Sequence, residues 1–220
     1  FSGYSDIAIG VALLLGYEFN RNFNQPYRAE SLRDFWQRWH ISLSTWIRNY
    51  LYIPMGGSKG GAVRRSFTLV LTMTLAGLWH GAGWNFILWG FLHGAGQAVE
   101  RGFRGLGVAL PRLLGIVLTF AIVAALWLPF RAHNFADTLS MLAAFGKTEG
   151  YAAPELTPTV WGLIAIGFAM NWLPLAWRDR ATMVLARLAP ELQALILGIG
   201  IFALFATAQE GVAPFIYFQF

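Results

Sequence analysis

His80 is the residue whose surroundings most favour chemistry, because residues 66–99 around it contain no Asp, Glu, Lys or Arg. An ionisable side chain within an apolar run marks a functional site by default. A neutral imidazole in an apolar pocket can act as a general base near pH 7. The alternative is a structural histidine whose ring bonds a carbonyl of a broken helix.

Three other histidines are present, and only His40 is a second candidate for chemistry. It falls among apolar residues, although a histidine at a membrane interface can equally bond a carbonyl or a lipid phosphate. His93 is expected to pack, and His133 is expected to be solvated. The sequence has no cysteine, and His40 and His80 lie on separate elements without a third ligand, so we predict no metal site and no disulfide framework.

Basic residues suggest a second kind of site, for an anion such as a pantetheine phosphate. Residues 18–65 hold eight basic and three acidic side chains, and we predict contacts with the anion from Arg38 and Arg48. Positive-inside bias and attraction to lipid headgroups would explain any single arginine as well. Asp6 and Asn85 are candidates for buried polar groups near the histidines. Nucleotide-binding and serine-hydrolase motifs are absent, which disfavours a nucleotide-driven pump or a serine hydrolase.

The composition is that of a membrane protein, with 56% hydrophobic and only 12% charged residues in a chain of 220. A soluble domain carries roughly 25% charged residues. Residues 113–130, 156–177 and 192–209 contain no formal charge, and a bilayer core needs roughly 20 apolar residues in a helix. We therefore predict an all-α, polytopic membrane protein, in which the net charge of +5 reflects topology and not nucleic-acid binding.

His40 is expected on an interfacial helix over residues 31–52. Ser31 is the predicted N-cap, Asp34 completes a pattern like a capping box, and Pro54 follows the end of the helix. A projection at about 100° per residue places His40 on an aromatic face opposite a basic face.

His80 is expected at a break between two helices, over residues 66–79 and 84–100. One straight helix of 34 residues would be roughly 50 Å long, well beyond a hydrocarbon core of about 30 Å. Gly77, Gly81 and Gly83 cluster near the middle, and broken helices at membrane depth are tolerated where they are buried in protein or line a wet cavity. We predict a re-entrant hairpin with His80 at its apex.

The distribution of charge predicts the topology. The basic loops 101–112 and 178–191 and the basic region 18–65 are expected in the cytoplasm, and the mixed loop 131–155 outside. The chain opens on Phe1 within an apolar segment, so we expect that the N-terminal half of a larger protein is missing. Residues 1–220 would then be one fragment of a membrane domain, with the catalytic region at about 1–100 and C-terminal transmembrane helices at about 110–210.

Four segments resemble the membrane-bound O-acyltransferase family (MBOAT), in its bacterial branch that acylates exported polymers such as alginate or teichoic acid. They are residues 1–10 (FSGYSDIAIG), 35–44 (FWQRWHISLS), 77–81 (GLWHG) and 214–220 (PFIYFQF). Each motif is weak alone, and the set is specific.

The resemblance implies roles for the candidate residues. His80 would be the catalytic histidine and His40 the second histidine of the active site. The donor would be a co-substrate, acetyl-CoA or an acyl-carrier thioester, and no cofactor would be bound.

The same resemblance implies acetylation of an exported polysaccharide such as alginate, at the bacterial inner membrane and with periplasmic acetyltransferase partners. Two alternatives stay open. One is transfer of D-alanine to teichoic acid, and the other is a transporter or flippase in which His80 relays protons.

Overall fold

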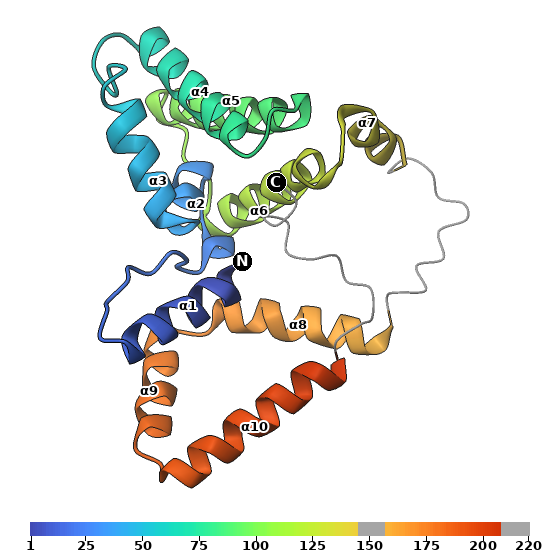
Figure 1. The fold of residues 1–220 in the computed structure, drawn as a ribbon. Coiled ribbons are helices and arrows are strands. Elements are labelled where there is room, and N and C mark those ends of the chain that lie inside the picture. The colour runs from blue at the N-terminus through green and yellow to red at the C-terminus, as the bar shows by residue number, and fades with distance from the viewer. Residues whose placement is uncertain (145–156, 208–220) are drawn as a thin grey trace. The chain divides into compact units, whose positions relative to one another are not determined.

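The computed structural model describes residues 1–144 and 157–207, and every regular element in these two ranges is a helix (Figure 1). The chain divides into two compact units, Phe1–Trp172 and Leu173–Phe220, each of which the structure describes for the residues in these two ranges. The first unit contains α1 (Ser2–Leu14), the short 3-10 helix η1 (Pro26–Arg28), α2 (Leu32–Arg38), α3 (Ile41–Ile47), the π-helical turn η2 (Arg48–Tyr52), α4 (Ala62–Trp79), α5 (Trp84–Gly105), α6 (Arg112–Arg131), α7 (Phe135–Ala144) and α8 (Pro158–Trp172). The second contains α9 (Leu175–Ala186) and α10 (Pro190–Thr207). The prediction of an all-α chain is confirmed for these residues.

Helices α4 and α5 form the predicted hairpin, with the break at residues 80–83, and they lie side by side in Figure 1. Glycines allow the two backbones to touch. A Cβ atom on Gly77 would overlap the carbonyl oxygen of Phe86, and one on Gly94 would lie 2.7 Å from the Cα atom of Val70. The pairing is antiparallel, because later residues of α5 meet earlier residues of α4. Small residues at such an interface allow the close approach typical of helix pairs in membranes.

The prediction of one continuous helix over residues 31–52 is wrong. The structure breaks it at Trp39, whose backbone is extended, and at His40, whose φ of 43° is left-handed. The passing chain holds this break: the Ile41 amide donates to the Asn22 carbonyl oxygen (3.0 Å), and the Asn24 amide donates to the Arg38 carbonyl oxygen (2.9 Å). Tertiary hydrogen bonds thus replace those that a continuous helix would make at these backbone groups.

The start of this segment is as predicted. The Ser31 hydroxyl accepts a hydrogen bond from the Asp34 amide (3.1 Å), and the Asp34 carboxylate accepts one from the Glu30 amide (3.1 Å). Leu32 is the first residue of α2, and its amide donates to the carboxylate of Glu100 on α5 (2.7 Å). Glu100 therefore ties the N-terminus of α2 to the far end of the hairpin.

The core of the first unit lies between α2, α6 and the segment before α2. Its buried members are Ala29, Leu32, Phe35 and Val123, and four larger aromatic side chains, Tyr27, Trp36, Trp39 and Trp127, pack against them. Burial of such side chains contributes about 1.5–3 kcal/mol each, so this cluster is what holds α2 on α6.

Within the described residues, only α6 is a helix long and apolar enough by itself to cross a membrane. The predicted run 156–177 is interrupted at Leu173 and Pro174, because proline cannot continue the helix hydrogen-bonding pattern. Helix α7 was not predicted and lies in the expected loop 131–155. One predicted run starts at position 156 and another ends at position 209, and both positions lie outside the described residues. The segment 214–220, which carries part of the resemblance, lies outside them as well.

Candidate active site

His80 lies at the break of the hairpin and ends α4. Its amide donates to the Gly77 carbonyl oxygen (2.9 Å), which completes the last turn of the helix. The imidazole is half-buried among aromatic rings, with ring centroids 5.3 Å from Trp89 on α5 and 5.1 Å from Phe130 on α6. His80 therefore lies in a chamber of packed aromatic side chains from α5 and α6, as the prediction of a break buried in protein requires.

His40 lies at the break of the other segment. Its left-handed backbone (φ 43°, ψ 57°) is unusual for a residue other than glycine and is held by the contacts of Asn22 and Asn24. The ring packs edge-on against Phe1, with centroids 4.8 Å apart. Burial lowers the pKa of His40 below its usual 6.5, so this ring is neutral at pH 7. Strain at an irregular position is typical of functional sites.

The structure brings the two histidines together, because the imidazoles of His40 and His80 lie close enough to interact electrostatically. They come from elements that are separated by 40 positions in the sequence. An imidazole at such a position can take a proton from a hydroxyl group, and a second one nearby can orient the reacting groups. Among the described residues, no group of three or more His, Cys, Asp or Glu side chains gathers in a way that could hold a metal ion.

The remaining polar candidates divide into buried and exposed residues. His93 is fully buried and accepts a hydrogen bond from the indole of Trp36 (3.4 Å), and His133 is exposed, both as predicted. Asn85 is buried (3% exposed), also as predicted. The prediction for Asp6 is wrong: its side chain is exposed, and the neighbouring Ser5 is buried instead, because adjacent residues point about 100° apart around a helix.

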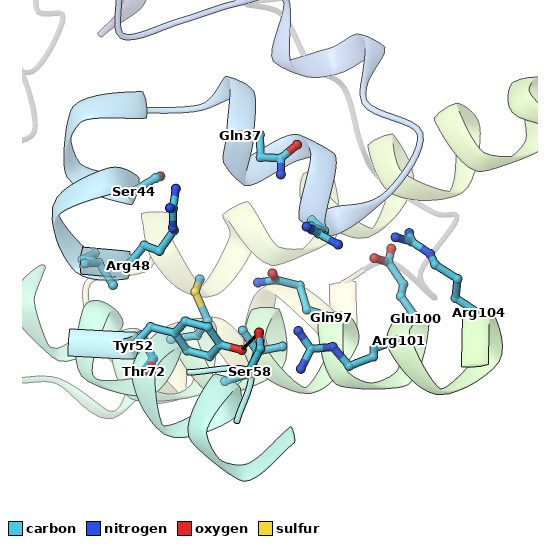
Figure 2. Close-up of a pocket in the computed structure, with 14 residues that line it drawn as sticks. Gln37, Ser44, Arg48, Tyr52, Ser58, Thr72, Gln97, Glu100, Arg101 and Arg104 are labelled. Carbon is cyan, nitrogen blue, oxygen red and sulfur yellow. Dashed lines mark hydrogen bonds between the residues drawn. The ribbon is translucent and has the colours of Figure 1, made fainter. Parts of the chain in front are cut away.

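A basic pocket lies between the segment 32–52 and the hairpin (Figure 2). The cavity has a volume of about 360 Å³. It is lined by four arginines, one carboxylate and several neutral polar or apolar side chains: Arg33, Gln37, Ser44, Ile47, Arg48, Tyr52, Ser58, Leu69, Thr72, Met73, Gln97, Glu100, Arg101 and Arg104. The excess of positive charge suits an anionic ligand.

The pocket includes only one of the two arginines predicted to contact an anion. Arg48 lines it, whereas Arg38 does not and is instead paired with the Asp34 carboxylate (2.8 Å). The i, i+4 spacing of these two residues in a helix was a sequence signal for that pair.

Sequence reasoning missed the contributions of Arg33, Tyr52, Arg101 and Arg104 to the basic pocket. Gln97, Arg101 and Arg104 share one face of α5, and their i, i+4 and i+7 spacing could have identified them. In Figure 2 the side chain of Arg101 extends toward Tyr52, whose hydroxyl lies 3.3 Å from that of Ser58. Burial acts to raise the pKa of Tyr52, but the hydrogen bonds to Ser58 and Arg101 and the charges of Arg101 and Arg33 together lower it.

Comparison with known proteins gives consistent relatives. The chain is 53% identical over 160 residues to a protein of Pseudomonas aeruginosa described as "probable alginate O-acetylase AlgI", a match that covers 71% of this chain and 30% of the relative. A protein of Pseudomonas putida with the same description is 37% identical over 244 residues, covering all of this chain and 50% of the relative.

A peptidoglycan O-acetyltransferase of Helicobacter pylori is 39% identical over 161 residues, covering 71% of this chain and 31% of the relative. The chain thus spans between about a third and a half of the length of these relatives. The model of the membrane-bound O-acyltransferase family matches residues 1–128, which include both histidines, the hairpin and the basic pocket. The chain therefore belongs to the membrane-bound O-acyltransferase (MBOAT) family.

Proposed function

We propose that the protein transfers acetyl groups from a thioester donor to hydroxyl groups of an exported polysaccharide such as alginate. The observation that carries the proposal is the position of His80 among aromatic rings at the break of the hairpin, with His40 near enough for the two imidazoles to affect each other electrostatically. The relatives, which are named for O-acetylation of alginate or peptidoglycan, support the choice of acyl group and of a polysaccharide acceptor.

In this mechanism His80 acts as the general base. A sugar hydroxyl is a poor nucleophile until its proton is removed, and general base catalysis typically contributes about 10² to 10⁴ in rate. His80 takes the proton while the hydroxyl oxygen attacks the thioester carbonyl carbon. The carbon–sulfur bond then breaks, the thiol leaves with the proton, and the ester remains on the sugar. His40 orients or polarises the reacting groups from its position beside His80.

We assign the anionic end of the donor to the basic pocket. A thioester donor, acetyl-CoA or an acyl carrier, carries a phosphate on its pantetheine arm, and arginines bind phosphate through paired hydrogen bonds. Arg48 supports this assignment because it lines the pocket, together with Arg33, Arg101 and Arg104. Arg38, which is paired with Asp34, has a weaker claim to a donor contact.

We propose that the protein is a multi-pass protein of the bacterial inner membrane. Basic residues in 18–65, 101–112 and 178–191 support a cytoplasmic location for these regions, and the basic pocket would then open toward a cytoplasmic donor. The acceptor is exported, and the family resemblance implies periplasmic acetyltransferase partners that work on the same polysaccharide.

The experiment that tests the proposal is His80→Ala in the full-length protein, scored for polymer acetylation and for movement of substrate across the membrane. We expect acetylation to fall at least about 100-fold, the lower bound for loss of a general base. The matched control is His133→Ala, because His133 is exposed and outside the chamber. Unchanged acetylation in His80→Ala would reject the proposal that the protein is an acyltransferase that uses His80. Loss of movement with acetylation intact would favour a transporter in which His80 relays protons, and incorporation of D-alanine in place of acetyl would identify the other acyl group.

A further inference from the structure

Asn85 is a buried polar residue that the proposed chemistry does not use. It lies in the first turn of α5, directly after the residues 80–83 that follow α4, and only 3% of it is exposed. A buried amide must find partners for its N–H groups, because an unmade hydrogen bond in the interior is costly. The partners of Asn85 therefore indicate what it is there to hold.

Both partners lie at the end of α6. The side-chain amide of Asn85 donates to the carbonyl oxygens of Ala132 (2.9 Å) and Pro129 (3.3 Å). The last carbonyl groups of a helix have no partner within the helix. Asn85 thus caps α6 from another element, 44 and 47 positions away in the sequence.

Phe130 lies between the two capped carbonyls in the chain, and its ring is part of the wall around His80. The ring centroid of Phe130 is 5.1 Å from that of His80 and 5.0 Å from that of Trp89. Phe86, the residue after Asn85, contacts the same ring at 5.5 Å. A shift in the backbone at either capped carbonyl would therefore move the ring that packs on His80.

We propose that Asn85 is a positioning residue that holds the end of α6 so that Phe130 packs against the imidazole of His80. This inference rests on the proposed role of His80 as the general base. It requires a side-chain amide: aspartate would place carboxylate oxygens against two carbonyl oxygens, and alanine would leave both carbonyls without the donor. Serine keeps a single donor on a shorter side chain and is expected to restore part of the function.

The test uses the full-length protein in vesicles, with acetyl transfer measured per amount of folded protein. Asn85→Ala and Asn85→Asp are expected to lower kcat about 10-fold or more, since small misplacements near a reacting group are costly, while KM for the donor changes less than about twofold. The matched control is Thr138→Val, because Thr138 is equally buried and its hydroxyl also bonds a backbone carbonyl, but that of Asn134 in its own helical turn and not one at the end of α6. Its kcat is expected to stay at the level of the parent protein.

A double variant decides whether Asn85 acts through Phe130. If it does, Asn85→Ala combined with Phe130→Leu lowers kcat no further than the more severe single variant, whereas independent roles would multiply the two losses. Multiplied losses, or a parent-level kcat in Asn85→Ala, would overturn the inference. If Asn85→Ala does not accumulate, the same two measurements are made on Asn85→Ser: its own kcat, and its kcat in combination with Phe130→Leu. If His80→Ala is inactive while the Asn85 variants keep the kcat of the parent protein, the positioning role of Asn85 is rejected and the proposed function stands. Full activity of His80→Ala would reject the proposed function itself.

Discussion

The hairpin α4–α5 and the segment 32–52 each carry one of the two candidate histidines, and they hold it in different ways. The hairpin holds His80 with two regular helices in backbone contact, and glycines at the interface make that contact possible. The segment holds His40 at an irregular backbone position, through hydrogen bonds to the Asn22 carbonyl oxygen and from the Asn24 amide in the passing chain. The first arrangement depends on the absence of side chains, and the second depends on specific tertiary hydrogen bonds.

The hairpin should be the more sensitive of the two to an added methyl group. A Cβ atom on Gly90 would overlap the carbonyl oxygen of Met73 and lie 3.1 Å from the Cα atom of Gly77. Overpacking of this kind typically costs about 1–3 kcal/mol, so Gly90→Ala should lower the free energy of unfolding by that amount. Denaturant unfolding of the purified full-length protein measures the change.

The same helix offers the control, because nothing lies within 4 Å of a Cβ atom on Gly102. Alanine is favoured over glycine in a helix by about 1 kcal/mol, so Gly102→Ala should leave stability unchanged or raise it slightly. Equal effects of Gly90→Ala and Gly102→Ala would contradict the close contact of α4 and α5.

The segment 32–52 should respond instead to the backbone conformation of His40. Both His40→Gly and His40→Ala remove the imidazole, but only glycine adopts a left-handed backbone without cost. The cost for other residues is roughly 1–2 kcal/mol, partly offset by the greater freedom of glycine in the unfolded chain. We expect His40→Gly to unfold at a higher denaturant concentration than His40→Ala. The opposite order would mean that His40 is not left-handed in the folded protein.

A smaller effect is expected at the side chain of Asn22. Its amide oxygen accepts a hydrogen bond from the Ser42 amide (3.0 Å), and loss of such a bond costs about 0.5–1.5 kcal/mol. Asn22→Ala should therefore destabilise the protein by this amount in thermal unfolding, while Asn20→Ala, at an exposed position before the break, serves as the control. If the two variants melt together, the Asn22 side chain does not support the break.

The smallest effect concerns the pH dependence of stability. Burial lowers the pKa of His40 in the folded protein below the 6.5 of the unfolded chain, so the unfolded state binds more protons below pH 6.5. The contribution of His40 to stability should then be lost as the pH falls below 6.5. Comparing the Tm difference between about pH 7 and about pH 5.5 in the parent and in His40→Gln measures it. If Tm decreases more in His40→Gln than in the parent protein over this pH range, His40 is not the group that causes the loss of stability.

The same contrast explains what the sequence could predict. The break that carries His80 was predictable because a charge-free run too long for one span contained a glycine cluster, and both signals are local. The break at His40 was not, because residues 35–44 contain neither glycine nor proline and the backbone partners that fix it, the Asn22 carbonyl and the Asn24 amide, lie outside the expected helix. Helical periodicity describes the sequence on either side of the break correctly and says nothing about the contact with Asn22.

The predicted anion site stays a prediction, and the structure shows a basic pocket that contains part of its residues. A local excess of charge indicated an anion site, and Arg48 lines it. Arg38 was predicted in the same way and is paired with Asp34. Arg101 and Arg104 reach the pocket from α5, and charge counting alone does not place them beside residues 33–58 because that requires the docking of α2 on the hairpin.

The hydrogen bond from the Leu32 amide to the Glu100 carboxylate spans 68 positions and has a consequence for the order of assembly. Residues 32–52 leave the ribosome before α5 is complete, whereas the hairpin closes between neighbours in the chain and needs only a short loop. We therefore expect the first amide of α2 to lack its hydrogen-bond partner, and its aromatic face to lack its packing partner, until Glu100 and the rest of α5 have been synthesised. The pairing of the two histidines would then be among the last events in the assembly of the first unit, because His40 meets the hairpin that carries His80 only after α5 is complete.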